Sequence, residues 1–272
     1  MLKEEILRFI DSDNDSFMDF WLDHYPADAN QVLENSERTK YDSSIKQEYL
    51  DNGIYEEVYE VDINSFSFTL LKQHNTNEEI DKIIETIEII NNTLKDDLSL
   101  FRLKRLRIAL FLSIGTVFFK YFNATTYNTV IRRMDQMMSL LITHLSNYNK
   151  LMNGFDSVIT KEKPNEENIT RLIYPLKFKL TKYNSLIKFM NLIYIKPEGF
   201  SDYKEKKSTS TNTDEVKREI IKSLINKEFD NAKKVVEVAV LNQRLKNAYI
   251  KEIEKVREKE EIENNEKRKY WA

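Results

Sequence analysis

Glycine and proline are unusually scarce in this chain, which has 4 of each among its 272 residues and no cysteine. Average usage would give roughly 19 glycines and 14 prolines at this length. Glycine permits left-handed turns and close backbone approach to a ligand, and proline ends helices and stiffens turns. A chain with so little of either has few of the loops on which catalytic sites are usually built. We therefore expect long helices joined by polar connections.

Apolar periodicity supports this expectation over most of the chain. Apolar residues keep helical spacing over 80–94, and two longer runs, 127–152 and 176–194, alternate spacings of three and four residues as in a heptad repeat. Each run places one apolar stripe along a helix. The pattern predicts an all-α fold, a multi-helix bundle over residues 1–196 with coiled-coil-like packing.

One stretch departs from helical spacing. Between residues 55 and 72, apolar and polar residues alternate on both sides of a polar step, Asn64-Ser65. Alternation with a period of two is typical of a strand that is buried on one face. We therefore predict a small β-hairpin here, within an otherwise helical protein.

The most apolar segment has 12 consecutive uncharged residues between Arg107 and Lys120. A membrane-spanning helix needs about 20 predominantly apolar residues. We therefore expect no membrane span and predict a buried central helix instead. Gly115 lies deep in this segment and indicates a position where another helix approaches closely.

The last third of the chain reads as a linker followed by a helix. Residues 197–213 are predicted to be a flexible linker, because Pro197 and Gly199 open it and Lys, Ser, Thr and Asn follow. No glycine or proline occurs after Gly199. Residues 214–272 are therefore predicted to form one long, partly extended C-terminal helix, with a charged tail after residue 256.

That predicted helix carries an apolar stripe longer than a compact bundle could cover. The stripe consists of Ile221, Leu224, Ile225, Val235, Val238, Leu241, Leu245, Tyr249, Ile253 and Val256. Left uncovered, it would promote aggregation. We expect residues 216–256 to dock onto other protein subunits, in a homo- or hetero-oligomer.

These features favour a non-enzymatic structural or interaction subunit of a larger protein assembly. The absence of cysteine suits a reducing compartment, and the first 15 residues lack the basic and apolar segments of a signal peptide. We therefore expect a cytoplasmic or otherwise intracellular protein. A viral or phage structural protein, and hence a virion location, is a compatible setting, since Asn, Lys and Ile are abundant as in AT-rich genomes.

Charge is strongly segregated along the chain. The net charge is −15 over residues 1–94 and +9 over residues 95–190, and +3 over 191–272 brings the total to −3. Two interpretations are open: the acidic third packs on the basic third, or the basic region binds nucleic acid. The second is our alternative hypothesis, a nucleic-acid-associated accessory factor. Its candidate contacts are Arg102, Lys104, Arg105, Arg107, Arg132 and Arg133.

Recognisable catalytic and metal-binding motifs are missing from the sequence. Asp11, Asp13 and Asp15 resemble the start of a calcium loop, but Ser16 replaces its glycine and Leu22 stands where its bidentate glutamate should be. The three histidines are far apart, and no phosphate-binding or nucleophile motif occurs. We therefore expect no enzymatic activity, no cofactor and no metal.

Overall fold

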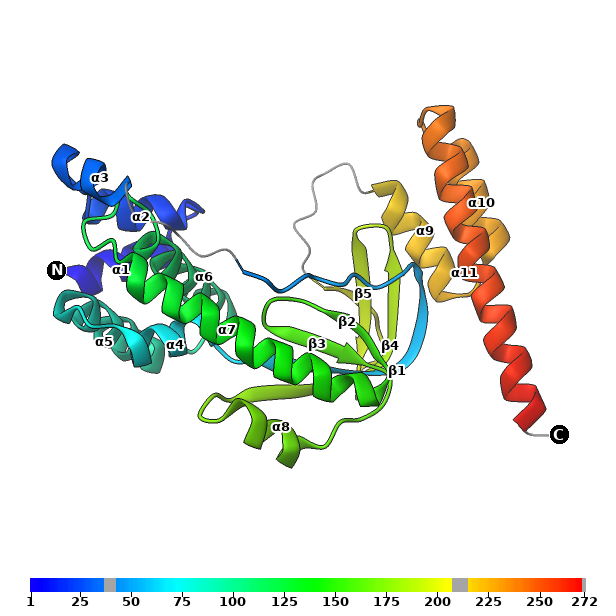
Figure 1. Cartoon of the computed structure of the whole chain (residues 1–272). Coiled ribbons are helices and arrows are strands. Elements are labelled where there is room, and N and C mark those ends of the chain that lie inside the picture. The colour runs from blue at the N-terminus through cyan, green and yellow to red at the C-terminus, as the bar shows by residue number, and fades with distance from the viewer. Residues whose placement is uncertain (37–42, 207–214, 271–272) are drawn as a thin grey trace. The chain divides into compact units, whose positions relative to one another are not determined.

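The computed structural model describes residues 1–36, 43–206 and 215–270, with side chains up to residue 266. The protein is mixed α/β, with 58% of its residues in helices and 17% in strands. It divides into two compact units, the first formed by residues 1–46, 63–141 and 170–177 and the second by the rest (Figure 1). The prediction of an all-α bundle is therefore wrong.

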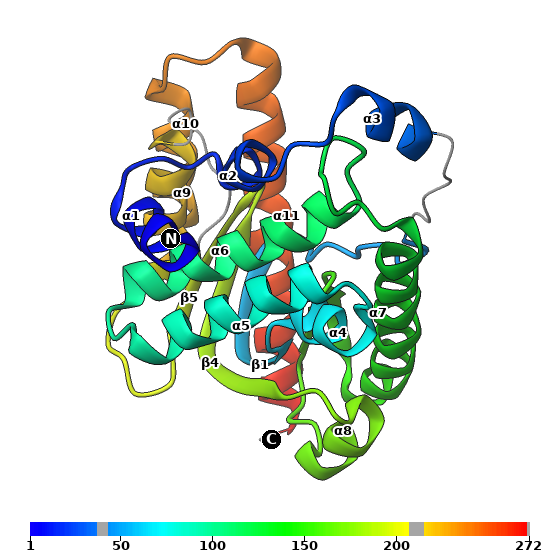
Figure 2. The same ribbon diagram turned by 90° about the vertical axis from the view of Figure 1, so that its left-hand side faces the viewer.

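The first unit consists of helices. Its elements are α1 (Leu2–Asp11), α2 (Phe17–His24), α3 (Ala29–Ser36), α4 (Phe66–His74), α5 (Glu78–Thr93), α6 (Asp97–Ile114), most of α7 (Ala124–Leu145) and the last part of α8 (Glu166–Ile173). α6 is the central helix, in contact with α1 and α2 and with α4 and α5 (Figure 2). Its residues Leu103, Leu106 and Leu110 are fully buried. The apolar segment between Arg107 and Lys120 is only partly as predicted, because α6 ends at Ile114 and Ile108 and Leu112 are exposed.

Two residues shape the helices of this unit. The side chain of Asn77 caps α5 by accepting hydrogen bonds from the backbone N–H groups of Glu79 (2.9 Å) and Ile80 (3.3 Å). Gly115 ends α6, and a Cβ atom there would lie 2.6 Å from the ring of Tyr127 on α7. Only glycine leaves room for that ring, so the predicted close approach of another helix is present, but at the end of α6 rather than deep within it.

The second unit is built on a six-stranded antiparallel sheet in the order β2-β3-β1-β4-β5-β6. The strands are β1 (Gly53–Ile63), β2 (Lys150–Asn153), β3 (Ser157–Thr160), β4 (Phe178–Phe189), β5 (Leu192–Pro197) and β6 (Lys204–Glu205), with the short helix η1 (Ser146–Tyr148) before β2. Val61 of β1 lies opposite Val158 of β3, and Ile187 of β4 lies opposite Tyr194 of β5.

The heptad runs do not form a coiled coil. The second run, 176–194, forms the antiparallel strands β4 and β5, which turn at Met190 with a φ of 54°. Leu186 and Ile187 are both fully buried, although neighbouring residues of a strand point to opposite faces. A strand buried on both faces has apolar residues at adjacent positions, and their spacing can imitate a heptad. The first run is helical to Leu145 and then enters β2.

The predicted β-hairpin is present only in its first half. Residues 53–63 form β1, but Ser65 takes a left-handed conformation with a φ of 49° and starts α4. Phe66, Phe68 and Leu70 are all buried on α4. Because this short helix is buried around most of its circumference, its apolar residues are not confined to helical spacing and imitate a strand.

The C-terminal region is three helices rather than one long helix: α9 (Glu215–Ile225), α10 (Phe229–Val238) and α11 (Gln243–Tyr270). The first break is at Lys227, whose φ is 58°, and the second is the segment 239–242. Of the predicted linker, 197–206 completes β5, turns at Gly199 and forms β6, and its remainder lies outside the described residues.

Left-handed backbone is supplied here mainly by residues other than glycine. Among the described residues, Gly199 is the one glycine with positive φ, and the others with positive φ are Glu57, Ser65, Asn149, Met190 and Lys227. At Lys227 the side chain forms ion pairs with Glu260 (2.7 Å) and Glu56 (3.4 Å). These contacts offset a backbone conformation that costs an L-residue roughly 1–2 kcal/mol.

Candidate functional site

The C-terminal helices cover one face of the sheet (Figure 1). Most residues of the predicted docking stripe are therefore buried within the chain itself. Of the ten stripe residues, Ile221, Leu224, Tyr249, Ile253 and Val256 are buried with Ile187, Phe189 and Leu192 of the sheet, and Ile225, Val235 and Leu241 pack against the same cluster. Eight of the ten therefore belong to the core of the second unit. The apolar partner that the sequence required is the chain's own sheet.

The end of the hairpin formed by α10 and α11 is different. Val238 is 82% exposed, Val240 is fully exposed and Leu245 is 40% exposed. We call these three residues the hairpin tip. A single exposed apolar side chain is common on protein surfaces, but neighbouring exposed valines at one protruding turn form an apolar patch.

The turn that carries the hairpin tip is well defined. The N–H of Ala239 donates to the carbonyl of Val235 (3.2 Å) and closes α10. The side chain of Asn242 accepts from the N–H of Leu245 (2.9 Å), which caps the start of α11. Because both helix ends are satisfied, the exposure of Val240 belongs to an ordered turn.

Charges of both signs flank the hairpin tip, because the exposed Glu237 directly precedes Val238. Lys234 and Arg244 are exposed, and within the described part of the chain neither takes part in an ion pair. Lys233 is held by Glu254, which joins α10 to α11, and Lys246 donates to the backbone carbonyl of Glu237. The hairpin therefore presents an apolar end with the exposed side chains of Lys234, Arg244 and Glu237 beside it.

Of the six predicted cations, Arg102 and Arg105 on α6 are engaged within the first unit. Arg102 is buried and donates to Asp15 (3.2 Å) and to the backbone carbonyls of Phe9 (3.2 Å) and Asn14 (2.6 Å). Arg105 contacts the same carboxylate at 3.4 Å and lies 4.3 Å from the ring centroid of Phe17. At this point the acidic N-terminal region does pack on the basic helix.

The remaining members of that cluster differ in exposure. Arg107 lies 5.6 Å from the ring centroid of Phe68, and burial lowers the pKa of its guanidinium, an effect that nearby Glu88 opposes. Lys104 on α6 and Arg132 and Arg133 on α7 are exposed. The structure therefore does not bring the six predicted cations together on one surface.

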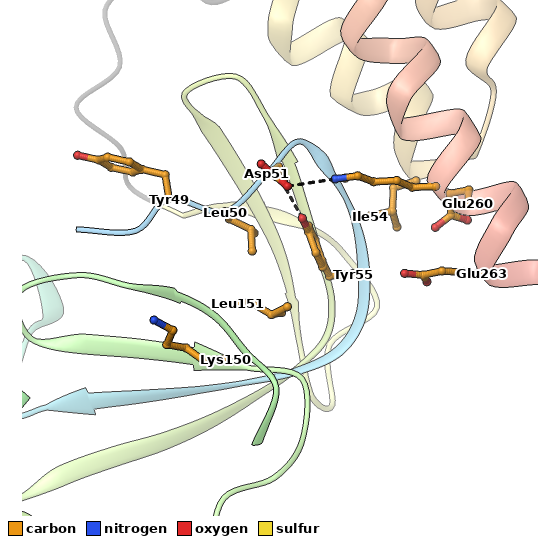
Figure 3. Close-up of a pocket in the computed structure, with 11 residues that line it drawn as sticks. Tyr49, Leu50, Asp51, Ile54, Tyr55, Lys150, Leu151, Glu260 and Glu263 are labelled. Carbon is orange, nitrogen blue, oxygen red and sulfur yellow. Dashed lines mark hydrogen bonds and ion pairs between the residues drawn. The ribbon is translucent and has the colours of Figure 1, made fainter. Parts of the chain in front are cut away.

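A pocket of about 380 Å³ lies within the second unit (Figure 3). Three segments line it: residues 49–55, Lys150 with Leu151 on β2, and one face of α11. Sequence reasoning missed this site, because its residues come from parts of the chain that are far apart. Within the described residues there is no cluster of His, Asp or Glu side chains arranged to hold a metal ion.

Sequence reasoning also missed Val240, the most exposed residue of the hairpin tip. A signal was present, since Asn242 stands where a helix cap is favoured and could have indicated the break before α11.

In the part of the chain that the structure describes, no helix has the length and apolar character needed to cross a bilayer.

Comparison with known proteins gives no family for this chain. No protein-family model matches it, and no curated protein is similar to it in sequence. Among solved structures, it is similar to the family B DNA polymerase from the hyperthermophilic archaeon Pyrobaculum calidifontis, at 9% sequence identity and a TM-score of 0.48. The match covers 76% of this chain and only 36% of the polymerase chain, and a likeness this low does not identify a shared fold.

Proposed function

We propose that this protein is a non-enzymatic interaction subunit that docks onto another protein of a larger assembly through the hairpin tip. The observation that carries the proposal is the full exposure of Val240 beside Val238 on an ordered turn. Burying one valine side chain stabilises a complex by roughly 1.5–3 kcal/mol before the costs of association. A protruding apolar end fits a concave apolar surface on a partner.

The charges beside the hairpin tip support the same mode of binding. Lys234 and Arg244 would lie at the rim of such a contact, where exposed charges mainly affect association rate and choice of partner. The core residues of the predicted stripe would not take part, because they already pack on the sheet.

The test is the double variant Val238→Asp/Val240→Asp in the full chain. The partner is first identified by affinity purification from the native source, and its affinity for the purified chain is then measured. We expect the variant to bind roughly a hundredfold more weakly, because two buried valines would be replaced by charges. The matched control, Asn264→Asp/Asn265→Asp, makes the same charge change at exposed positions of α11 and should bind normally.

Two results would contradict the proposal. In one, the double variant binds the purified partner as tightly as the parent chain. In the other, the chain binds phospholipid vesicles through the hairpin tip and no protein partner depends on it.

The alternative, a nucleic-acid-associated accessory factor, has less support. Arg102 and Arg105 pair with Asp15, Arg107 lies against the ring of Phe68, and the exposed candidates Lys104, Arg132 and Arg133 are divided between two helices. Binding to single-stranded DNA at low salt that weakens when these three residues are neutralised would favour the alternative.

A further inference from the structure

The pocket in the second unit has an apolar centre. Leu50, Leu151 and Tyr55 belong to one apolar cluster, and Ile54 also lines the pocket (Figure 3). Gly53 makes room for that ring, because a Cβ atom at position 53 would lie 3.1 Å from its Cε2 atom. Leu50 and Ile54 are buried, whereas Tyr55 is half-buried and faces the pocket. These side chains offer a surface for an apolar or aromatic group.

Charges of both signs line the same pocket. Lys150 comes from β2, Asp51 precedes β1, and Lys259, Glu260 and Glu263 come from α11. A simple anion would meet three carboxylates here, and a simple cation would meet two ammonium groups. A ligand that carries one charge of each sign satisfies the lining best.

These charged groups differ in how firmly they are held by the protein. Lys150 lies 2.7 Å from Glu48, and Glu260 lies 2.7 Å from Lys227, so both already have close partners. The contacts of the other two α11 residues are longer: 3.5 Å from Lys259 to Asp51, and 3.8 Å from Glu263 to Lys161. Both of these residues are also substantially exposed, at 49% and 39%.

Lys259 and Glu263 are one helical turn apart on α11, so they lie on the same face of the helix. Both line the pocket, and Glu263 is near enough to Tyr55 to contribute to the raised pKa of its hydroxyl. Lys259 and Glu263 thus offer opposite charges at adjacent positions beside the apolar side chains, and a ligand carboxylate at Lys259 would take the place of the exposed Asp51 carboxylate, 3.5 Å away.

We propose that this pocket binds a free α-amino acid with an apolar side chain. Its carboxylate would be held by Lys259 and its ammonium group by Glu263, with the side chain against Tyr55 and Leu151. This site is independent of the hairpin tip, so the docking function and the pocket can fail separately. A peptide terminus carries only one of the two charges at its end, whereas a free amino acid supplies both.

The first test is calorimetric titration of the full chain with L-phenylalanine as the probe. We expect saturable binding. N-acetyl-L-phenylalanine lacks the ammonium group and L-phenylalanine amide lacks the carboxylate, so each should bind about tenfold more weakly, the loss of one charge-assisted hydrogen bond. Equal binding of all three compounds, or no saturable binding of L-phenylalanine, would overturn the proposal.

Two variants assign the charges. Glu263→Gln should weaken the binding of L-phenylalanine and abolish the preference over the N-acetyl compound, while the preference over the amide remains. Lys259→Gln should show the reverse pattern. The controls are Glu266→Gln and Lys251→Gln, which remove the same charges from exposed positions of α11 outside the pocket lining.

Nuclear magnetic resonance provides a measurement that does not depend on the variants. Nuclear Overhauser contacts should connect the ring protons of bound L-phenylalanine with the side chains of Tyr55 and Leu151 in the parent chain. Contacts with residues elsewhere in the molecule would overturn the placement even if the calorimetric signal is present.

Discussion

The two ends of the α10–α11 hairpin come from one apolar stripe in the sequence, yet they differ completely in environment. At the base, Tyr249, Ile253 and Val256 are buried against the sheet, and at the tip Val238 is exposed to solvent together with Val240, which lies outside the predicted stripe. The comparison teaches that an apolar stripe longer than a bundle does not by itself imply a partner, because a sheet within the same chain can cover it. Only the part that remains exposed after folding is a candidate for docking.

The largest effect should come from the base of the hairpin. Ile253→Ala removes a fully buried side chain from the core of the second unit and should lower the free energy of unfolding by about 3 kcal/mol. Urea unfolding followed by circular dichroism measures it. The control is Ile262→Ala on the same helix, which is 59% exposed and should change stability by less than about 0.5 kcal/mol. Similar losses at both positions would show that the buried face of α11 is wrongly assigned.

A second, smaller effect extends the comparison to the charged residues of α6. Arg102→Ala leaves the carbonyls of Phe9 and Asn14 without their donor and should cost about 2 kcal/mol of stability. Lys104→Ala, two positions along the same helix but exposed, should be nearly neutral. If thermal unfolding finds the two variants equal, Arg102 does not join the acidic loop to the helix.

A third effect concerns the pocket and depends on pH. Burial, followed by Asp51 and Glu263, raises the pKa of Tyr55 to about 12 in the folded protein. The unfolded chain loses this proton near pH 10, so between pH 10 and 12 the unfolded state binds fewer protons than the folded state. The free energy of unfolding should therefore fall as the pH rises through this range. Tyr55→Phe should make this decline shallower in urea titrations at alkaline pH. Tyr49→Phe, at a 76% exposed position, should leave the slope unchanged.

The smallest effect is expected at the hairpin tip. Val238→Asp/Val240→Asp should change the free energy of unfolding by less than about 0.5 kcal/mol, because neither side chain is buried. The same variant is expected to weaken docking strongly, so stability and binding would separate. A large loss of stability in the isolated chain would instead show that the valines are part of the fold.

Local signals in the sequence located several helices but not the architecture. The helix α5 could be predicted because its apolar spacing and the cap at Asn77 are local properties. The strands β4 and β5 could not, since burial on both faces removes the alternation that identifies a strand. The break at Lys227 was also invisible, because its left-handed backbone is supported by Glu56 and Glu260, which are distant in sequence.

The candidate sites were predictable to different degrees. The region that carries the hairpin tip was identified from its apolar content, but the helix was expected to continue through it and Val240 was not singled out. The pocket forms where residues 49–55 lie beside Leu151 and Glu263 in the fold. No local sequence pattern predicts contacts between segments so far apart in the chain. Because the C-terminal helices pack on the sheet, deleting residues 214–272 would expose apolar core residues and would not isolate a docking role.

Among the described residues, five that are not glycine have positive φ, and they reverse a common rule of protein engineering. Replacing glycine is a standard way to stabilise a protein, since glycine increases the entropy of the unfolded chain. Here the opposite substitution is favourable wherever the side chain contributes little, as at Ser65, which precedes α4 without capping it. The chain could therefore be stabilised by adding glycine, a residue that is scarce in its sequence.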